Sequence, residues 1–535
     1  MNLLAKLSHE ALALVCRKAD QRFEKQSHQL ERVQRQKLAK ILKQINFPTD
    51  QRSSQGAINS YEKFAATLPV TRYSHWKERI ENTRQGNDAL SRSKLVRYQP
   101  TSGSSESIKF IPYYQEFLDE LDGAIGPWLS SMYRAYPSLK KGSHYWSISW
   151  LPESQRHLLT DKNLNDDSVL LDWGKRLLSQ YTQAVPSDVA FAGSADDALF
   201  ATLCYLIADA NLSMLSVWSP TFAIQLLDNV QLWGDEIAAV LTLGHWGLRA
   251  SSLSQIKAPK APVRAQILER LLNKPLMDWQ ALWPNLCLVS CWDTAGAKAW
   301  AQQLQDRLPF ARFEGKGLWA TEGVVTLPYN GHYPLAYQSH FYEFENLNTG
   351  KIVPSWELQL GDEVSPILTT GSGLLRYCMD DHLVVSEFYG SLPCFTFKGR
   401  RFGVDLVGEK LDPSTALAAL QNSAKPIKDC KPVSLLAIDT EGQSKPYYLA
   451  VFEGTAAQAP AAAAVDDQLK LNFHYELARN LGQLAPVEVI CVEDGWHYYK
   501  QLAMQSGMIE GNIKPEPLKK IHINALKQAG TSIKI

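Results

Sequence analysis

Hydrophobic positions recur every three or four residues over residues 1–45, and this spacing predicts a helical region at the start of the chain. The same spacing returns in Tyr113–Tyr133, where a second amphipathic helix is expected. Between these helices, Leu95–Tyr98 and Phe110–Pro112 are short runs rich in apolar and aromatic residues. Such runs are typical of strands, so the residues between them are expected to form a loop that joins two strands.

The middle of the chain alternates short apolar runs with helical patterns. Leu286–Cys291 predicts a buried strand, Ala295–Leu308 an amphipathic helix, and Gly317–Ala320 the next strand. A strand, a helix and a strand in this order indicate a βαβ unit, and with it an α/β domain. Two further extended segments are expected at Tyr337–Phe344 and Trp356–Gly361.

A hairpin and a second, smaller unit follow. Leu383–Phe388 and Pro393–Phe397 flank Gly390, a residue that favours turns, and predict the two strands of the hairpin. The smaller unit is expected to begin at residue 409, which divides the chain into residues 1–408 and residues 409–535. The elements expected in the smaller unit are a helix at Thr415–Gln421, strands at Tyr447–Phe452 and Val487–Val492, a long helix at Gln468–Leu484, and a mobile low-complexity loop at Thr455–Ala464.

The composition is that of an ordinary globular protein without a strong charge. Of the 535 residues, 45% are hydrophobic and 21% are charged, with 55 Lys and Arg against 55 Asp and Glu. A chain of this length exceeds the usual size of a single core, so at least two domains are expected. Because no net field attracts nucleic acid or a membrane surface, neither is expected as a partner, and small molecules are favoured.

The cysteines and the apolar runs predict a cytoplasmic protein. The eight cysteines are scattered without a C-x-x-C pair, which favours a reducing compartment over a disulfide framework or a zinc site. Lys6, His9 and Glu10 interrupt the first residues, which therefore lack the apolar core of a signal peptide. The longest apolar run, Ala198–Ala208, is too short to cross a bilayer.

The loop between the first two strands has the sequence TSGSSESIK, from Thr101 to Lys109. Hydroxyl side chains and glycine favour turns and bonds to the backbone, so a flexible surface turn is one interpretation. The alternative is a binding site for an anion such as phosphate, since successive N–H groups, hydroxyls and a lysine all attract one. The loop is not a Walker A motif, because G-x-x-x-x-G-K-[ST] is absent.

Four charged residues far from this loop complete a set of groups that suits ATP. Glu322 can hold Mg²⁺, and Asp381 can accept both hydroxyls of a ribose. Arg400 can lie near that ribose, and Lys514 can reach the phosphates. Each of these residues, taken alone, is an ordinary surface side chain. Together with the Thr101–Lys109 loop they supply the groups required when the α-phosphate of ATP is attacked.

The order and spacing of these segments resemble the adenylate-forming superfamily. Within it, the chain is similar to the Gretchen-Hagen-type acyl acid amido synthetases, specifically to their bacterial members. Thr101–Lys109 resembles the T-S-G-[ST]-[ST]-G-x-x-K loop of the superfamily at equal length. The other segments that carry the resemblance are TLPVTRYSHW at Thr67–Trp76, CWDTAGAKAW at Cys291–Trp300, GLWATEG at Gly317–Gly323, HFYEFEN at His340–Asn346, GLLRYCMDD at Gly373–Asp381, FKGR at Phe397–Arg400, GEKL at Gly408–Leu411 and NFHYELARNLGQL at Asn472–Leu484.

The resemblance implies a fold and a role for each matching residue. The implied fold is of the α/β class: a large N-terminal domain of mixed sheets and helices with a β-barrel-like part, and a smaller, mobile α+β C-terminal domain. Thr321, Glu322 and Lys514 are the implied catalytic residues, and Glu322 is the implied metal ligand. The implied nucleotide contacts are Ser102, Gly103, Ser104, Ser105 and Lys109 on the phosphates, Thr321 and Glu322 near the α-phosphate and Mg²⁺, Tyr377 and Asp381 with Asp381 on the ribose hydroxyls, Arg400 near the ribose, and Lys514 reaching the phosphates from the C-terminal domain.

The implied activity is a ligation in two steps. A carboxylic acid reacts with ATP to give an acyl-adenylate and pyrophosphate, and an amine, expected to be an amino acid, then takes the acyl group. Two alternatives stay open: an acyl-CoA ligase, and a nucleotide-binding protein without catalysis. His144 and Trp146 lie where an acyl pocket of the family could be lined, although aromatic residues there also suit a plain core. Nothing in the sequence identifies the acid, the amine or the oligomeric state.

Two positions bear on whether the site is catalytic, and a third bears on which lysine reaches it. Glu106 and Asp380 stand where the family motifs have glycine, so that either residue could impair the site. Asp tolerates a positive φ better than most residues, which favours a working turn at Asp380. Lys519 is a rival of Lys514 for the role of the C-terminal lysine, because the surrounding sequence can be aligned in either way.

Overall fold

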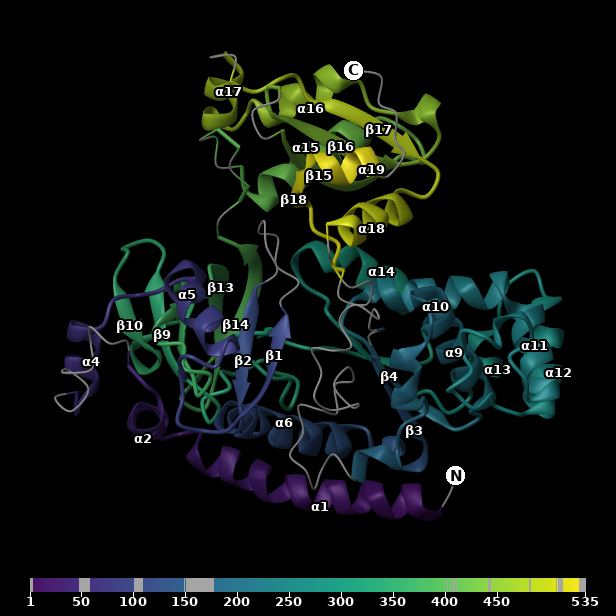
Figure 1. Cartoon of the computed structure of the whole chain (residues 1–535), viewed down its shortest axis with the longest axis horizontal. Helices are drawn as coiled ribbons and strands as arrows, with labels where there is room; N and C mark the ends of the chain where they lie inside the picture. Colours follow the sequence, from purple (N-terminus) through teal and green to yellow (C-terminus); the bar gives the residue numbers. More distant parts are fainter. Residues whose placement is uncertain are drawn as a thin grey trace.

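The structure of the chain is a computed structural model, which Figure 1 shows as a broad lower body with a smaller unit above it. No described helix has the length and apolar character needed to cross a membrane. The residues described are 3–47, 58–100, 109–148, 150, 178–401, 403–404, 406–407, 409, 411–440, 444–480, 483–506, 508 and 513–528.

Two long helices form the base of the lower body (Figure 1). α1 (Leu3–Gln26) packs along α6 (Gln115–Ala135), and the buried stripe of α1 includes Phe23. α2 (Leu30–Gln44) begins after a break of three residues. The helical region predicted for residues 1–45 is therefore confirmed, as two helices.

A six-stranded antiparallel sheet forms one side of the lower body. Its main path runs β10-β9-β11-β13-β14, with β12 paired to β11. The predicted hairpin is confirmed in β13 and β14, and Gly390 takes the positive φ of +62° that its turn requires. Among the described strands, the two edge strands β10 and β14 do not pair with each other, so the sheet is open. The barrel-like part implied by the resemblance stays a prediction. The strands are β9 (Phe341–Asn346), β10 (Ile352–Pro354), β11 (Glu363–Thr369), β12 (Tyr377–Cys378), β13 (Asp381–Tyr389) and β14 (Leu392–Arg400).

The extended segment predicted at Trp356–Gly361 is wrong. Ser355–Glu357 form a turn of 3₁₀ helix, and the strand begins only at β11. The reason is local: Gly361 takes a φ of +87°, and the carboxylate of Asp362 accepts a hydrogen bond from the N–H of Gln359. A side-chain bond of this kind competes with strand pairing.

The other side of the lower body is a four-stranded parallel sheet in the order β3-β4-β5-β6, covered by helices. The predicted βαβ unit is confirmed, but its second strand is β6. The strand expected at Gly317–Ala320 is confirmed only at residues 319–320, which form β7, and its expected place in the βαβ unit is wrong, because β7 pairs with β8 in a separate two-stranded hairpin. The strands are β3 (Ser143–Trp146), β4 (Leu212–Ser216), β5 (Leu288–Cys291), β6 (Arg312–Gly315), β7 (Trp319–Ala320) and β8 (Gly323–Val324), and the helices are α9 (Ala195–Ala208), α10 (Pro220–Leu232), α11 (Gly234–Leu243), α12 (Pro262–Leu272), α13 (Trp279–Leu282) and α14 (Lys298–Arg307).

The upper unit is built around a mixed sheet in the order β17-β16-β15-β18. The long helix predicted at Gln468–Leu484 is wrong, since α16 ends at Leu469 and α17 begins at Phe473. The loop expected at Thr455–Ala464 is wrong in part: a capping box between Thr455 and Gln458 starts a 3₁₀ turn, and the alanines enter α16. The elements are α15 (Pro413–Ala424), β15 (Lys431–Asp439), β16 (Tyr447–Glu453), α16 (Ala462–Leu469), α17 (Phe473–Asn480), β17 (Glu488–Val492), α18 (Gly495–Gln505), β18 (Leu518–His522) and α19 (Ile523–Gln528).

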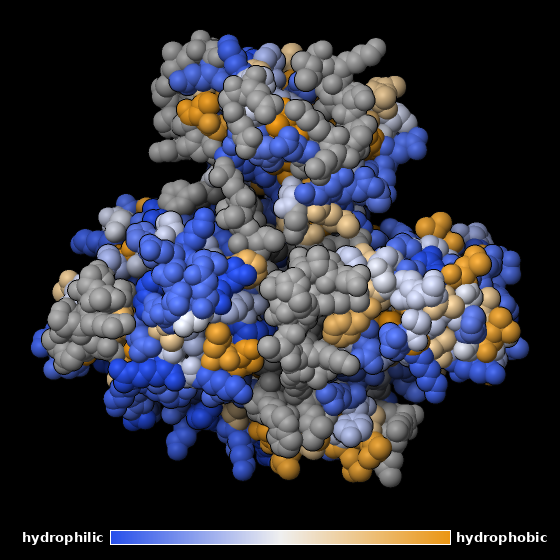
Figure 2. All heavy atoms as spheres, viewed as in Figure 1, coloured by the Kyte–Doolittle hydropathy of each residue, from blue (hydrophilic) through white to orange (hydrophobic). Residues whose placement is uncertain are grey.

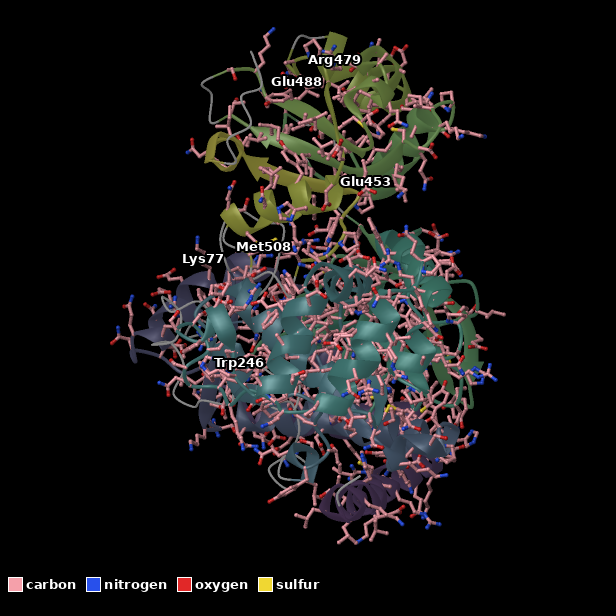
Figure 3. All side chains as sticks on the ribbon, turned by 90° about the vertical axis from the view of Figure 1, so that its right-hand side faces the viewer. Lys77, Trp246, Glu453, Arg479, Glu488 and Met508 are labelled. Carbon is pink, nitrogen blue, oxygen red and sulfur yellow. The ribbon has the colours of Figure 1, made fainter. Side chains whose placement is uncertain are left out.

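Contacts between aromatic side chains join the two bodies. α18 lies directly above α14 (Figure 1), and the ring centroids of Trp300 on α14 and Trp496 on α18 are 5.7 Å apart. Figure 3 labels Met508 at the lower border of the upper unit and Trp246 inside the lower body. The hydropathy view in Figure 2 shows hydrophilic residues over most of the described surface of this face, with apolar residues in small separate groups.

The N-terminal segment Thr67–Trp76 is tied to the segment that precedes β13. Thr71 donates a hydrogen bond from Oγ1 to the carbonyl of Leu375 at 2.7 Å and accepts one from Trp76 Nε1 at 2.9 Å. The segment lies between α4 (Tyr61–Thr67) and α5 (Tyr73–Arg84). Two sequence motifs more than 300 residues apart are thus held edge to edge.

A buried ion pair strengthens this connection. Arg376 forms a two-pronged pair with Glu343, with both N–O distances at 2.9 Å, and both side chains are almost fully buried. The same guanidinium donates to the carbonyls of Ala65 and Leu68 at the end of α4. Burial raises the pKa of Glu343, and the charge of Arg376 opposes that rise.

We expect Arg376→Met to lower the free energy of unfolding by about 3–5 kcal/mol, because it leaves the Glu343 carboxylate buried without its partner. Urea denaturation followed by circular dichroism measures the loss. The matched control is Arg307→Met, whose partner Asp228 is largely exposed, and the expected loss there is below about 1 kcal/mol. Equal losses in the two variants would contradict the importance assigned to the buried pair.

Candidate functional site

The hairpin of β7 and β8 presents Thr321 and Glu322 in its two-residue turn. Tyr113 donates a hydrogen bond from its hydroxyl to the carbonyl of Thr321 at 2.9 Å. Tyr377 donates from its hydroxyl to Glu322 Oε1 at 3.3 Å, and burial raises the pKa of the Tyr377 phenol. The two predicted residues of this turn are therefore positioned by phenols from β2 (Phe110–Tyr114) and β12.

Buried polar groups support the hairpin from below. The N–H of Val324 donates to His340 Nε2 at 3.2 Å, and His340 Nδ1 lies 2.8 Å from Glu120 Oε2. Gly323 stands where a Cβ atom would come within 3.0 Å of His340 and of Leu368. Only glycine fits this close approach without a shift of its neighbours, which explains a glycine directly after Glu322.

Asp381 and Arg400 occupy paired positions on β13 and β14. The Nε atom of Arg400 lies 3.8 Å from Oδ1 of Asp381, whose side chain is buried while that of Arg400 is about half exposed. Burial raises the pKa of Asp381 to about 6, and the charges of Arg400 and Lys514 oppose the rise. The strand register thus brings together two residues that the sequence assigned to the same ribose.

Asp380 fills the position where the family motif has glycine. Its φ of +57° lies in the left-handed region, which Asp tolerates. Its carboxylate is held by the guanidinium of Arg72, with Nε 3.0 Å from Oδ2 and Nη2 2.9 Å from Oδ1. The turn therefore forms with Asp380 in place, and Arg72 compensates its charge.

Lys514 reaches this group from the upper unit. Its Nζ atom lies 3.3 Å from the ring centroid of Trp292, which follows β5 in the lower body. Burial and the charge of Arg400 lower the pKa of Lys514 to about 7, and the carboxylates of Glu516, Asp381 and Glu322 oppose the shift. A lysine from the upper unit thus stands among the predicted nucleotide contacts.

Lys519 lies elsewhere. It is buried on β18 and donates from Nζ to Glu516 Oε1 at 3.0 Å and to the sulfur of Met508 at 3.1 Å. Both partners belong to the upper unit. The structure therefore places Lys514, and not its rival, beside Asp381 and Glu322.

Lys109 is the described residue of the predicted phosphate loop. Its ammonium lies 5.5 Å from the ring centroid of Tyr73. Burial lowers its pKa, and among charged groups Glu322 opposes the shift while Arg400 adds to it. The two predicted strands are β1 (Leu95–Pro100) and β2, and the structure shows that they pair antiparallel. Ser102, Gly103, Ser104, Ser105 and Glu106 lie outside the described residues.

The convergence of charge is the main chemical property of this site. Lys109, Arg400 and Lys514 all interact electrostatically with the carboxylate of Glu322, and Arg400 and Lys514 also interact with those of Asp381 and Glu516. Lys109, Glu322, Asp381, Arg400 and Lys514 come from five segments that span more than 400 positions of the chain. Three cations around two carboxylates match a ligand with a polyanionic end and a hydroxylated ring.

The donor set also fits Mg²⁺ in the way that nucleotide sites hold it. The described residues contain no group of three His, Cys, Asp or Glu side chains that could enclose a metal ion. Mg²⁺ prefers one or two carboxylates together with water and substrate phosphates over a cage of protein ligands. Glu322, which is partly exposed in its turn, is a carboxylate suited to that arrangement.

Sequence reasoning missed several residues that shape the site. Trp292 and Arg72 lie within the quoted motifs CWDTAGAKAW and TLPVTRYSHW, but an aromatic and a basic residue in a motif carry no signal of their partners. Tyr113 was expected at the start of a helix, and it lies near the end of β2. These positions depend on contacts between distant segments, which a single sequence does not show.

Comparisons with known proteins agree with this arrangement. The chain matches the GH3 family N-terminal domain over residues 19–311, the GH3 family central domain over residues 333–400, and the GH3 family C-terminal domain over residues 415–520. It is 22% identical over 485 residues to the 4-substituted benzoates-glutamate ligase GH3.12 of Arabidopsis thaliana, covering 81% of this chain and 83% of that protein.

Solved structures share the fold at low sequence identity. A GH3.15 acyl acid amido synthetase superposes with a TM-score of 0.76 at 16% identity, over 95% of this chain and 94% of the other. The AtGH3.15 acyl acid amido synthetase in complex with 2,4-DB superposes with a TM-score of 0.74 at 15% identity, over 97% and 96%. The α/β class predicted from the sequence is confirmed.

The lowered pKa of Lys514 predicts how the affinity for ATP depends on pH. The ammonium is half deprotonated near pH 7, so its attraction for phosphate is present below that pH and is lost as the pH rises. We expect the dissociation constant for ATP to increase about 10-fold between pH 6 and pH 8.5, the size of one charged hydrogen bond. Isothermal titration calorimetry measures it.

The control for this measurement is Lys514→Met, which keeps the length of the side chain and removes the charge. Its affinity for ATP should be weak and should lack the loss with rising pH that Lys514 causes, so that the remaining pH dependence comes from ATP itself and from Asp381, whose pKa is raised to about 6. A wild-type profile with the same slope as that of the variant would contradict the assignment of the pH dependence to Lys514.

Proposed function

The chain belongs to the GH3 family, and we propose that it is an ATP-dependent acyl acid amido synthetase, a ligase that joins a carboxylic acid to an amine. The observation that carries the proposal is the meeting of Glu322, Asp381, Arg400 and Lys514 at one point. The amine is expected to be an amino acid, which the name of the similar benzoates-glutamate ligase supports. Membership of the bacterial branch and of the adenylate-forming superfamily is part of the proposal.

In the first half-reaction a carboxylate oxygen of the acyl acid attacks the α-phosphorus of ATP. The bond between that phosphorus and the β-phosphate oxygen breaks, which yields an acyl-adenylate and pyrophosphate. Lys514 and Lys109 neutralise the negative charge that develops on the phosphate oxygens, and this is electrostatic stabilisation in a partly dry site. Asp381 accepts hydrogen bonds from the ribose hydroxyls, and Arg400 lies beside it. Glu322 would hold Mg²⁺, which supplies charge neutralisation at the phosphates, and Thr321 lies beside it in the same turn, near the α-phosphate.

In the second half-reaction the amine nitrogen attacks the acyl carbonyl carbon. The bond from that carbon to the phosphate oxygen breaks, AMP leaves, and the nitrogen loses a proton. The electron pair of the broken bond goes to the phosphate oxygen of AMP, and in this proposal Lys514 acts in the first half-reaction and is withdrawn before the second. We propose that the chain divides into residues 1–408 and 409–535, and that the upper unit swings about the connection between them. That movement would separate Lys514 from Trp292 and Trp300 from Trp496.

The two alternatives make different products. An acyl-CoA ligase would pass the acyl group to a thiol, and a protein without catalysis would exchange no pyrophosphate. The carboxylate of Asp380 is paired with Arg72, which supports a working turn and so speaks against the non-catalytic alternative. The cytoplasmic location is part of the proposal and rests on the eight cysteines, all of which are free.

The primary test is exchange of labelled pyrophosphate into ATP in the presence of a library of carboxylic acids. We expect exchange with a subset of these acids, followed by release of AMP when amino acids are added. Product analysis with amino acids and with coenzyme A then separates the amide from the thioester. Absence of exchange with every acid would overturn the proposed function.

We expect Lys514→Ala to lower the rate of adenylation about 100-fold or more, the usual effect of removing one group that stabilises transition-state charge. The rate of amide formation from a supplied acyl-adenylate should stay within about 3-fold of wild type. Rapid-quench assays of the two half-reactions measure both rates. If both rates fell equally, the role given to Lys514 would be wrong.

The role of Asp381 is tested with a nucleotide that lacks the ribose hydroxyls. We expect wild-type protein to prefer ATP over 2′,3′-dideoxy-ATP by about 10-fold or more, as a charged hydrogen bond would provide. Asp381→Ala should lose this preference, while its affinity for the dideoxy nucleotide changes little. A preference that survives in the variant would place the ribose elsewhere.

A further inference from the structure

The motif CWDTAGAKAW, at Cys291–Trp300, has no role in the reaction proposed above. It begins with the last residue of β5 and ends in the first turn of α14, and a tryptophan stands near each of its ends. Trp292 follows β5 directly, and Trp300 lies on α14. Each of these two tryptophans contacts a residue of the upper unit.

The first contact is between Trp292 and the side chain of Lys514. The Nζ atom of Lys514 lies 3.3 Å from the ring centroid of Trp292, a distance at which the face of an indole attracts a cation. The indole is itself supported by the lower body. Its ring centroid is 5.4 Å from that of Trp218, and the N–H of Trp292 donates to the carbonyl of Trp218 at 3.0 Å. Trp292 therefore offers the ammonium group a surface that belongs to the lower body.

The second contact is between Trp300 and Trp496 of α18, whose ring centroids are 5.7 Å apart. The ring of Trp496 is stacked on that of Tyr499, with centroids 5.3 Å apart and an angle of 23° between the planes. The hydroxyl of Tyr499 donates to the backbone carbonyl of Lys514 at 3.0 Å. Two rings and one hydrogen bond thus connect Trp300 to the backbone of the lysine that Trp292 holds by its side chain.

The backbone beyond Lys514 is fastened to the upper unit as well. Ser434 donates from Oγ to the carbonyl of Glu516 at 2.7 Å, and the N–H of Leu435 donates to the carbonyl of Pro517 at 2.9 Å. Residues 514–517 therefore belong to the upper unit and follow it. The way in which the upper unit docks on the lower body determines where the ammonium group stands, and a group misplaced by a small distance loses much of its effect on a reaction.

The motif between the two tryptophans is held in a fixed shape. Ala295 takes a φ of +49°, which residues with a Cβ atom rarely adopt. Such a conformation persists only where the surrounding structure determines it. The carboxylate of Asp293 packs over Gly315 of β6, where a Cβ atom would come within 2.5 Å of it. The loop thus fits closely against the neighbouring strand, and it sets the distance between Trp292 and Trp300.

The contact at Trp496 also carries a cost. Within the described part of the chain, Nε1 of Trp496 is buried and has no hydrogen-bond partner. A buried N–H group without an acceptor is unfavourable, and it offsets part of what the contact between the rings contributes. The docked arrangement can therefore be left again without a large loss. A reaction in two steps with a mobile upper unit requires this property.

On the basis of the function proposed above, we propose that Trp292 and Trp300 are positioning residues for the adenylation step. Trp300 docks the upper unit through Trp496, and Trp292 receives the ammonium group of Lys514 and directs it to the phosphates. Both tryptophans act through Lys514. They serve the first half-reaction and have no part in the second, when the upper unit has moved away.

The kinetic test uses Trp292→Leu and Trp292→Phe. We expect Trp292→Leu to lower the rate of adenylation about 10-fold or more, the range of a contact between a cation and an aromatic face away from water. Amide formation from a supplied acyl-adenylate should stay within about 3-fold of wild type. Trp292→Phe keeps a ring face and should recover most of the adenylation rate. Rapid-quench assays of the two half-reactions measure these rates.

The same substitution in a Lys514→Ala background distinguishes positioning from a structural role. Without the ammonium group Trp292 has nothing to hold, so Trp292→Leu should change the remaining adenylation rate by less than about 2-fold. A 10-fold loss in that background would show a structural tryptophan and overturn the inference. The matched control is Trp279→Leu, which removes an indole stacked on Trp283 in the same body and should leave both half-reactions at the wild-type rate.

A measurement without catalysis tests the docking itself. Acetylation of the full-length protein by the N-hydroxysuccinimide ester of acetic acid, followed by mass spectrometry of its peptides, gives the rate at which each lysine is modified. We expect Trp300→Leu and Trp496→Leu to raise the rate at Lys514 about 3-fold or more, as loss of one aromatic pair would. The rate at Lys519 should not change, because its partners lie within the upper unit. An unchanged rate at Lys514 in Trp300→Leu, or an equal rise at Lys519, would contradict the docking role.

The outcomes also separate this inference from the proposed function. Should Trp292→Leu fail to fold, the acetylation rates of Trp300→Leu decide. Pyrophosphate exchange with adenylation at the wild-type rate in both Trp292→Leu and Trp300→Leu would sink the inference and leave the ligase in place. Faster acetylation of Lys514 in the variants, without exchange for any acid, would leave the docking contacts in place and overturn the ligase.

Discussion

The attraction between Lys514 and the carboxylates of Asp381 and Glu322 is the interaction on which the rest of the site depends. Burial works against every charge in this group: it raises the pKa of Asp381 and lowers that of Lys514. Each charge persists because an opposite one stands nearby. Such a site is less stable when it is empty. A bound polyanion stabilises it, because the negative charge of the ligand interacts favourably with the lysines.

The scaffold fixes the position of these charges through short links between distant segments. Thr71 is hydrogen-bonded to the backbone of Leu375, just before β12. The register of β13 and β14 sets Asp381 opposite Arg400. His340 accepts a hydrogen bond from Val324 and so supports the Thr321–Glu322 turn. All of these links use backbone groups or buried side chains. The lower body can therefore hold half of the site rigidly, while Lys514 is supplied by a separate unit with its own core.

The sequence predicted which charged residues come together better than it predicted the elements that support them. Glu322, Asp381, Arg400 and Lys514 lie in short motifs with a fixed order, and motif order survives when overall identity is low. The elements that failed were decided by other forces. Gly317–Ala320 has the composition of a strand that completes a βαβ unit, but Gly317 takes a φ of +73° and the chain turns into a hairpin. Gln468–Leu484 has a helical pattern, but the helix breaks after Leu469, and Asn472 caps the start of α17 by accepting a hydrogen bond at Oδ1 from the N–H of Tyr475.

The pair of Arg72 and Asp380 has a consequence for the history of this sequence. A glycine at position 380 would give the turn its positive φ without needing any neighbour, whereas an aspartate there brings a charge that Arg72 neutralises. Loss of Arg72 alone leaves the Asp380 carboxylate unpaired beside Asp381, whereas loss of Asp380 alone leaves an arginine that is about half exposed and is solvated. The order of replacement therefore matters: a return to glycine at position 380 is open to descendants of this protein first, and the exchange of Arg72 for a neutral residue only afterwards.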